Sequence, residues 1–283
     1  MSPSEILPDK ERFQEKIEML QRLPHFGLIR QISEMAADPD TSLQAIAEVI
    51  SRDISISGRL LRLINSPLYG FPGKISTVSQ ALILVGIDVL KGLIITSTMY
   101  ETLPRAWFSL WRHSLIVSRA CRQIGRMIKA RDPEEFATIG LLHDIGKVAF
   151  IKIAKSEYTA IHERSIRTGQ DLISLEKSLL GFTHADVSGW LCKKWFFPDK
   201  LTYPIQYHHE PENSPQFQDR AYAVFAANVL AGQIEGGVKD IKVVCEPLFP
   251  SSDGQMQEER FASLIDSVKR DYLILRDANP GDI

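Results

Sequence analysis

The sequence predicts an all-α protein, and three observations lead to that fold class. Apolar residues recur at three- and four-residue spacing in almost every periodic segment, which is the helical period. Strand-like alternation is scarce, and a hydrophobic content of 44% in 283 residues is enough for a sizeable core. We therefore expect three parts: an N-terminal helical part (1–104), a second helical domain (105–236), and a C-terminal loop with an amphipathic helix (237–283).

The first predicted helices are short. Ser42 is an N-cap candidate for a helix over residues 43–50. Four residues at helical spacing form the apolar face of that helix: Leu43, Ile46, Ala47 and Ile50. A second helix is expected over residues 55–64.

The next segment contains a loop and a break. Residues 65–74, NSPLYGFPGK, concentrate Pro and Gly and predict a structured loop. Residues 79–98 form either one long helix or two short ones, because Gly86 and Gly92 permit a break or close helix packing. Pro104 is the expected boundary with the second half.

The second half predicts further helices. Residues 106–127 read as one helix that carries His113, and Asp132-Pro133 begins another helix that ends at the pair His143-Asp144.

Two more helices are expected over residues 172–180 and 184–195, with Thr183 as the N-cap of the second. Residues 246–254 read as a loop, and residues 257–275 read as an amphipathic helix outside the main domain.

The cysteines and the apolar runs of the sequence indicate the cellular compartment of the protein. Three widely spaced cysteines form no CxxC pair and fit buried thiols in a reducing cytosol: Cys121, Cys192 and Cys245. The N-terminus has no basic start followed by an apolar core, and no apolar run reaches about twenty residues. We therefore expect a cytoplasmic protein without a membrane partner.

The clearest functional signal is an ordered series of histidines. Five of the seven histidines form it, together with one aspartate: His113, the pair His143-Asp144, His184, and the pair His208-His209. A lone histidine among apolar residues is more often an ordinary hydrogen-bonded residue than a ligand, so His25 and His162 receive no role. Asp144 follows the apolar run 136–142, and a buried carboxylate must be paired, hydrogen-bonded or bound to a cation. Imidazoles beside it favour a divalent metal.

The segment HDIGK carries two further residues of interest. Lys147 lies four residues after His143, so the two share a helix face if the helix continues through Gly146. Its ammonium would then meet an anionic ligand such as phosphate. The alternative is a solvated cation at a helix end. Gly146 leaves room for close backbone approach.

These motifs resemble a known family. HDIGK after an apolar helix, with one upstream histidine and downstream histidines in this order, is similar to the HD superfamily of metal-dependent phosphohydrolases. Residues 51–94, together with Leu23-Pro24 and the stretch 38–40, resemble the HDOD domain, a signalling relative of HD and HD-GYP phosphodiesterases. The resemblance covers roughly residues 20–235 and implies a multi-helix HDOD fold, with the HD-like domain over 105–236.

By motif position, the resemblance implies a set of metal ligands. Its seven members are His113, His143, Asp144, His184, His208, His209 and Asn228. Asn228 stands where the family has a final aspartate, and a neutral amide weakens cation binding. The chain also lacks the Gly-Tyr-Pro signature of HD-GYP enzymes, and it has Ser109 where they place a glutamate.

Two functions follow from the resemblance. The first, which the three departures favour, is a bacterial signalling or regulatory protein that binds partner signalling proteins or a nucleotide or phosphate ligand. The alternative is a metal-dependent phosphohydrolase or phosphodiesterase acting on a nucleotide or cyclic dinucleotide. There, one or two ions of iron, manganese, nickel or zinc would activate water, with Asp144 as the bridging ligand and Lys147 neutralising phosphoryl oxygens.

Nucleic-acid binding is the weakest of the function classes. With 33 basic and 35 acidic residues, the net charge of −2 gives no bulk attraction to phosphate backbones. Short helices near residues 42–63 could imitate a helix-turn-helix, with Arg52, Arg59 and Arg62 as contacts, but such helix pairs are common in helical cores.

Overall fold

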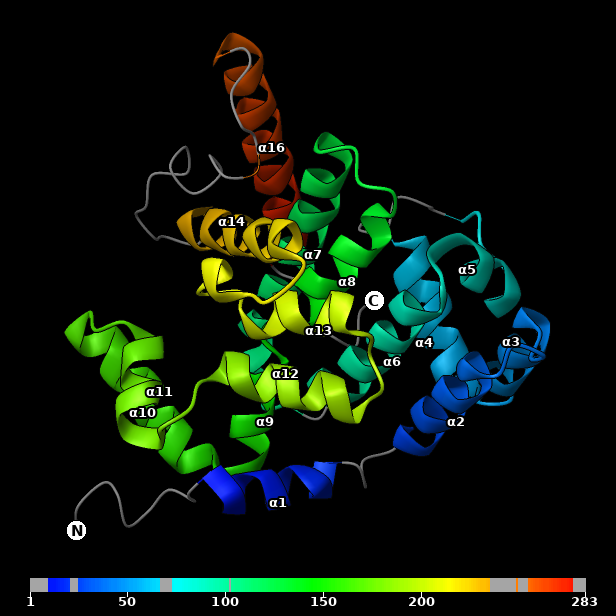
Figure 1. Cartoon of the computed structure of the whole chain (residues 1–283), viewed down its shortest axis with the longest axis horizontal. Coiled ribbons are helices and arrows are strands. Elements are labelled where there is room, and N and C mark those ends of the chain that lie inside the picture. The colour runs from blue at the N-terminus through cyan, green and yellow to red at the C-terminus, as the bar shows by residue number, and fades with distance from the viewer. Residues whose placement is uncertain are drawn as a thin grey trace.

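The structure is a computed structural model and describes residues 10–20, 25–66, 73–101, 103–234, 248 and 254–276. All the regular elements in those ranges are helices, which confirms the all-α prediction. Figure 1 shows α2 to α5 gathered on one side, α10 and α11 on the other, and α7, α8, α12, α13 and α14 between them. Residues 67–72 of the expected loop, Cys245 and nearly all of the expected loop over 246–254 lie outside the described residues.

Among the described residues of the N-terminal part, six helices are present. They are α1 (Lys10–Leu20), α2 (Phe26–Ala37), α3 (Leu43–Ser51), α4 (Ile54–Asn65), α5 (Val78–Val85) and α6 (Ile87–Glu101). The Ser42 hydroxyl accepts a hydrogen bond from the Ala45 amide at 3.1 Å, so the predicted N-cap is confirmed. The expected apolar face of α3 is correct except at Leu43, which is 53% exposed because it is the first residue of the helix.

The structure decides between the two readings of residues 79–98. Two helices are present, α5 and α6, and they meet at an angle of 115°. Gly86 lies at the break with φ of 80°, a conformation that glycine adopts without steric cost. Among the described residues, no single helix is both long and apolar enough to cross a membrane; only this bent pair, taken together, passes that test.

The second half begins with a short 3-10 turn, η2 (Arg105–Trp107), so the helix that was expected from residue 106 begins at Phe108. The elements that follow are α7 (Phe108–Met127), α8 (Pro133–Leu142), α9 (Ile145–Ile153), α10 (Lys155–Thr168), α11 (Leu172–Leu180), α12 (His184–Lys194), α13 (Asp199–Gln206), η3 (Pro211–Asn213) and α14 (Gln218–Ile234). Thr183 caps α12 through its hydroxyl and forms a capping box with Asp186, as predicted.

The C-terminal helix α16 (Gly254–Leu275) contains the predicted amphipathic segment. It packs on α7 and α14. Arg119 of α7 donates to the Asp271 carboxylate at 2.6 Å, and Asp271 is buried. The extension therefore rests on the two helices that carry His113 and Asn228.

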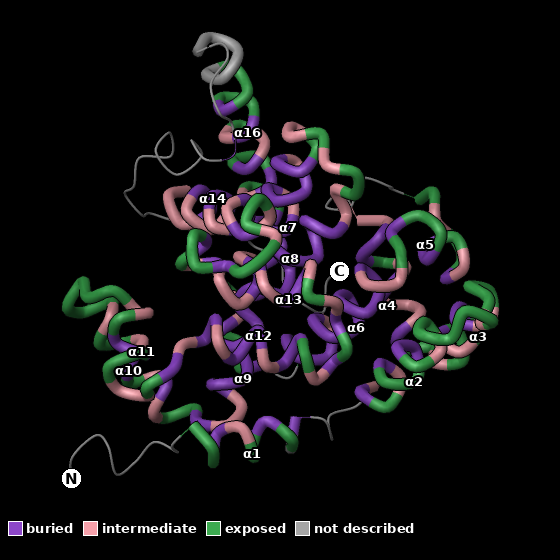
Figure 2. Tube along the Cα trace, in the orientation of Figure 1, coloured by how far each residue is buried: buried purple, intermediate pink, exposed green. Residues whose placement is uncertain are grey.

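The buried residues form one connected core that reaches from α1 to α16 (Figure 2). Helix α6 is buried on nearly every side and packs against α8, where a side chain at Gly92 would stand 3.3 Å from Thr138. Two of the three cysteines, Cys121 and Cys192, are buried free thiols, as expected. This core fixes the relative positions of the helices that surround the site.

Candidate metal centre

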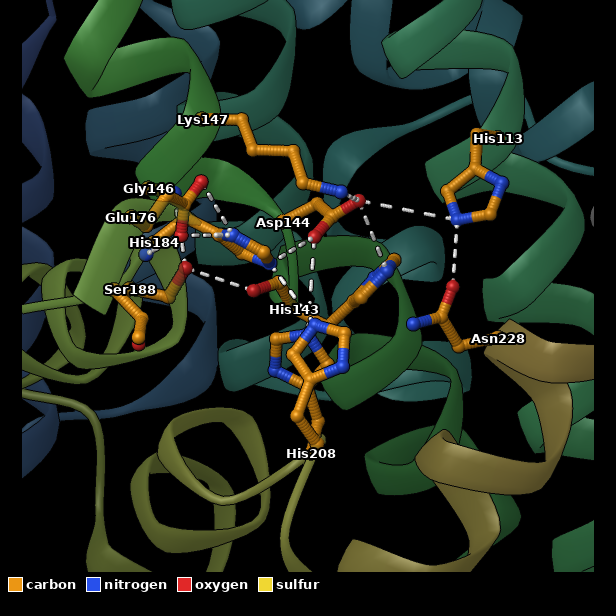
Figure 3. Close-up of polar contacts among 12 residues, drawn as sticks. His113, His143, Asp144, Gly146, Lys147, Glu176, His184, Ser188, His208 and Asn228 are labelled. Carbon is orange, nitrogen blue, oxygen red and sulfur yellow. Dashed lines mark hydrogen bonds and ion pairs between the residues drawn. The ribbon is translucent and has the colours of Figure 1, made fainter. Parts of the chain in front are cut away.

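The histidine series converges on one carboxylate in the middle of the second half. Helix α7 carries His113, the turn between α8 and α9 carries His143 and Asp144, and α12 begins at His184. His208 and His209 follow α13, and α14 carries Asn228. Figure 3 shows His113, His143, His184 and His208 gathered around Asp144, with Asn228 beside His113.

The turn at His143-Asp144 corrects one expectation. Helix α8 ends at Leu142 and α9 begins at Ile145, so the helix breaks at His143-Asp144, and the single continuous helix that would place His143 and Lys147 on a common face is not present. Lys147 instead reaches back to Asp144, three residues earlier, and its ammonium donates to the carboxylate at 2.7 Å.

Gly146 makes this turn possible. A Cβ at this position would stand 2.0 Å from the carbonyl oxygen of His184, so only glycine lets α9 cross the start of α12. The Gly146 amide donates to the Ser188 hydroxyl at 2.9 Å, and that hydroxyl donates to the carbonyl of His143 at 2.7 Å. The close backbone approach expected at Gly146 is present, and Ser188 ties both sides of the turn to α12.

The two carboxylate oxygens of Asp144 face different groups of side chains. We call one group the Oδ1 half: Asp144 Oδ1, His184, His208 and His209. We call the other the Oδ2 half: Asp144 Oδ2, His113, His143, Asn228 and Lys147. Asp144 has no exposed surface. It therefore has the position expected of a bridging ligand.

In the Oδ1 half, ring nitrogens stand close to one another and to Asp144. The Nε2 atom of His184 lies 3.2 Å from Oδ1 and 3.1 Å from Nε2 of His209, and Nε2 of His208 lies 3.8 Å from Oδ1. Ligand atoms that share an ion through bonds of about 2.1 Å lie about 3.0–3.4 Å apart. The closest pairs in this half already have that spacing.

In the Oδ2 half, the Nε2 atom of His143 lies 3.3 Å from Oδ2 and that of His113 lies 3.8 Å from it. His113 Nε2 also stands 2.9 Å from the amide oxygen of Asn228. The structure thus brings all seven sequence-predicted ligands into one cluster.

Hydrogen bonds to the backbone orient two of the rings. His143 donates from Nδ1 to the carbonyl of Gly140 at 2.8 Å, and His208 donates from Nδ1 to the carbonyl of Ile205 at 2.7 Å. Each neutral ring therefore presents an unprotonated Nε2 to the centre. Both Nε2 atoms and Oδ1 of Asp144 are buried without a hydrogen-bond partner. Buried acceptors without a donor fit a cation, because a cation satisfies the acceptors that surround it.

Sequence reasoning missed two residues behind His184. Glu176 of α11 is fully buried and accepts hydrogen bonds from Nδ1 and from the backbone amide of His184, each at 2.8 Å. The Tyr158 hydroxyl donates to the same carboxylate, also at 2.8 Å. A carboxylate that orients a ligand histidine is a common second layer of metal sites. No local motif marks it, because Glu176 and Tyr158 reach His184 only through the packing of three helices.

Electrostatics at the centre favour an ionised Asp144 and neutral rings at His208 and His209, whereas His184 differs from them. Burial alone raises the pKa of Asp144, but His143 and Lys147 outweigh it, and the pKa lies well below its usual range. Burial and the neighbouring rings hold the pKa of His208 and of His209 well below the ordinary value. For His184, burial lowers the pKa, but Glu176 overrides this effect and the pKa is raised.

The fold and the site together define a helical protein with an HD-type histidine and aspartate centre. The HDOD domain matches residues 22–211, well over half of the chain, and the chain therefore belongs to the HDOD family, as the sequence predicted. The match covers the turn at Asp144 and the pair His208-His209 and ends before Asn228.

Solved structures with the same fold come from several bacteria. One is a Shewanella amazonensis protein provisionally assigned as a phosphohydrolase, with TM-score 0.69, 23% identity, and coverage of 92% of this chain and 96% of that chain. Another is a Geobacter sulfurreducens HDOD domain protein of unknown function, with TM-score 0.65, 22% identity, and coverage of 93% and 99%. A third is a Marinobacter aquaeolei protein provisionally assigned to signal transduction, with TM-score 0.69, 18% identity, and coverage of 91% of this chain and 60% of that chain. At these identities the likeness shows the fold.

Among curated sequences, an uncharacterised protein of Treponema pallidum is 22% identical over 209 residues, which are 71% of this chain and 40% of that protein. The chain spans less than half the length of the curated relatives that it matches.

Proposed function

We propose that this chain is a bacterial signalling protein whose centre holds a divalent metal and, at its rim, a phosphate-bearing ligand such as a nucleotide. The burial pattern carries this proposal. His143, Asp144 and His208 have no exposed surface, whereas the Lys147 side chain is 14% exposed. An enclosed centre with a cation at its rim suits recognition of a small anion better than processing of a large substrate. Partner signalling proteins would respond to the ligand-bound state.

The donor set supports the metal part of the proposal. Two groups have ligand atoms within 4.8 Å of one another: the four residues of the Oδ1 half, and His113, His143 and Asp144. Imidazole and carboxylate donors suit iron, manganese, nickel or zinc. When bound, such an ion supplies Lewis-acid chemistry that makes water a nucleophile at neutral pH. The residues of the chain orient the donors, exclude bulk water and keep Lys147 beside the carboxylate.

A second candidate function is hydrolysis of a phosphoester of a nucleotide or cyclic dinucleotide. The observation that favours it is the placement of Asp144, which offers one oxygen to each half, as a bridging carboxylate does in sites with two ions. Lys147 would then neutralise charge on phosphoryl oxygens. Against this candidate stand the neutral Asn228 and the exposed Ser109 in the place of a carboxylate.

One set of measurements tests both functions. Purified protein would be analysed for metal, reconstituted with zinc or manganese, and titrated with nucleotides and cyclic dinucleotides by calorimetry. The same samples would be assayed for hydrolysis of cyclic dinucleotides and of an aryl phosphodiester. We expect bound metal, nucleotide affinity that falls at least tenfold in Lys147→Ala, and no turnover.

The controls distinguish the outcomes. Turnover that is lost in the His143→Ala, Asp144→Ala double variant, but kept in His25→Ala, would establish the hydrolase instead of the signalling-only function. His25 is a suitable control because it pairs with Asp53, outside the centre. A protein that stays free of metal after reconstitution contradicts both functions.

A further inference from the structure

The two halves of the centre differ in their surroundings. We propose that the first divalent ion binds in the Oδ1 half, because Glu176, supported by Tyr158, orients and strengthens the ligand His184. In the Oδ2 half, the ammonium of Lys147 takes the place of a second ion. This inference rests on the metal binding proposed above and goes beyond it, because it says which half binds first and why.

The Oδ1 half has the more complete donor set. Three imidazoles and one carboxylate oxygen converge there, and their ligand atoms all lie within 4.8 Å of one another. Two of these atoms, Nε2 of His208 and Oδ1 of Asp144, are buried acceptors without a hydrogen bond. An ion placed among these donors replaces no existing hydrogen bond of either acceptor.

Glu176 distinguishes His184 from the other rings. His143 and His208 are oriented by neutral carbonyl groups, but His184 is oriented by a buried carboxylate that also accepts from Tyr158. A carboxylate partner fixes the ring tautomer and increases the donor strength of the opposite nitrogen. It also places a negative charge directly behind the Oδ1 half, which attracts a cation.

Lys147 has the opposite effect on the Oδ2 half. Its ammonium already stands 2.7 Å from Oδ2, which is where an ion in this half would have to bind. Asn228, whose amide oxygen lies 2.9 Å from Nε2 of His113, adds no negative charge. A divalent ion in this half would therefore compete with an ammonium that already binds its carboxylate oxygen, whereas Oδ1, the oxygen that faces the other half, has no hydrogen-bond partner.

The experiment compares two matched histidine variants. His113→Ala and His209→Ala each remove one partly buried ring, the first from the Oδ2 half and the second from the Oδ1 half. Metal-free protein would be titrated with Co²⁺, following its visible absorption, and with Zn²⁺ by calorimetry. We expect one ion per chain, affinity within about threefold of wild type in His113→Ala, and affinity at least tenfold lower in His209→Ala.

Two further variants test the role of each charge. Glu176→Gln is expected to lower the affinity for the first ion by about 10–100-fold, and Tyr158→Phe to lower it less. Lys147→Met is expected to add a second, weaker ion, so that the stoichiometry rises from one to two. Thermal unfolding of each metal-free variant shows whether the fold is retained.

Loss of the first ion in His113→Ala with retention in His209→Ala would overturn the inference, as would two ions of equal affinity in the wild type. Either result leaves the proposed metal-binding function standing. If the wild type binds neither Co²⁺ nor Zn²⁺, the proposed function fails and the inference fails with it.

Discussion

The contact between Gly146 and α12 gives a sharp prediction for Gly146→Ala. The new Cβ would stand 2.0 Å from the carbonyl oxygen of His184, whereas ordinary contacts begin at 3.4 Å. The obstacle is backbone, so a side chain cannot rotate away to relieve it. Helices α9 and α12 must separate locally by more than about 1 Å, which also stretches the hydrogen bonds of Ser188 to both sides of the turn.

Two magnitudes follow. Overpacking of a well-packed core costs about 1–3 kcal/mol, and we expect about 3 kcal/mol here because backbone atoms collide. For a protein of this size, that loss lowers the unfolding temperature by about 6–12 °C. Because His184 begins α12, the same shift moves its ring, and the affinity for Zn²⁺ should fall at least tenfold, as it does when other supporting contacts of a metal site are removed.

The matched control is Gly232→Ala. Gly232 lies within α14, and a Cβ there would have nothing within 4 Å. Alanine is favoured over glycine in a helix by up to about 1 kcal/mol, so this variant should be equally or more stable. Thermal unfolding and zinc titration of both variants make the comparison. Unchanged stability and zinc affinity in Gly146→Ala would refute the reasoning about close backbone approach at this turn.

Three further predictions follow from contacts near and far from the centre. Thr183→Ala removes the cap of α12 and should cost about 1 kcal/mol and weaken zinc binding, whereas Thr77→Ala, which removes the cap of α5, should cost as much without affecting zinc. Arg119→Met leaves the buried Asp271 unpaired and should lower the free energy of unfolding by about 3 kcal/mol, measured by urea denaturation; an unchanged midpoint would argue against docking of α16 through this pair. Burial lowers the pKa of Lys91, so the folded protein loses this proton at lower pH than the unfolded chain, and stability should rise with pH up to the ordinary pKa of about 10.4. That rise should be absent in Lys91→Met, and an identical pH slope in both proteins would contradict it.

Much of the fold follows from local signals in the sequence. Ser42 and Thr183 cap the helices that they were predicted to cap, because a side-chain cap involves only residues three positions away. The bend at Gly86 was one of two open alternatives, and the sequence could not decide it because a glycine permits a break without requiring one. A single helix from His143 through Lys147 does not form: the chain breaks at His143-Asp144, and Ser188, far away in the sequence, bonds to both sides of that turn.

The sequence by itself determined the all-helical class, because helical periodicity and caps are local patterns, and its resemblance to the HDOD and HD families implied the family and the seven side chains that meet at the centre. Only the tertiary structure decided which oxygen of Asp144 each ring faces, that Glu176 and Tyr158 stand behind His184, and that Lys147 binds Oδ2. Those features depend on the packing of α7, α9, α11, α12 and α14 against one another. That packing sets the direction of the lone pairs on the histidine rings and the positions of the Glu176 and Lys147 charges, and these features distinguish the two halves of the centre.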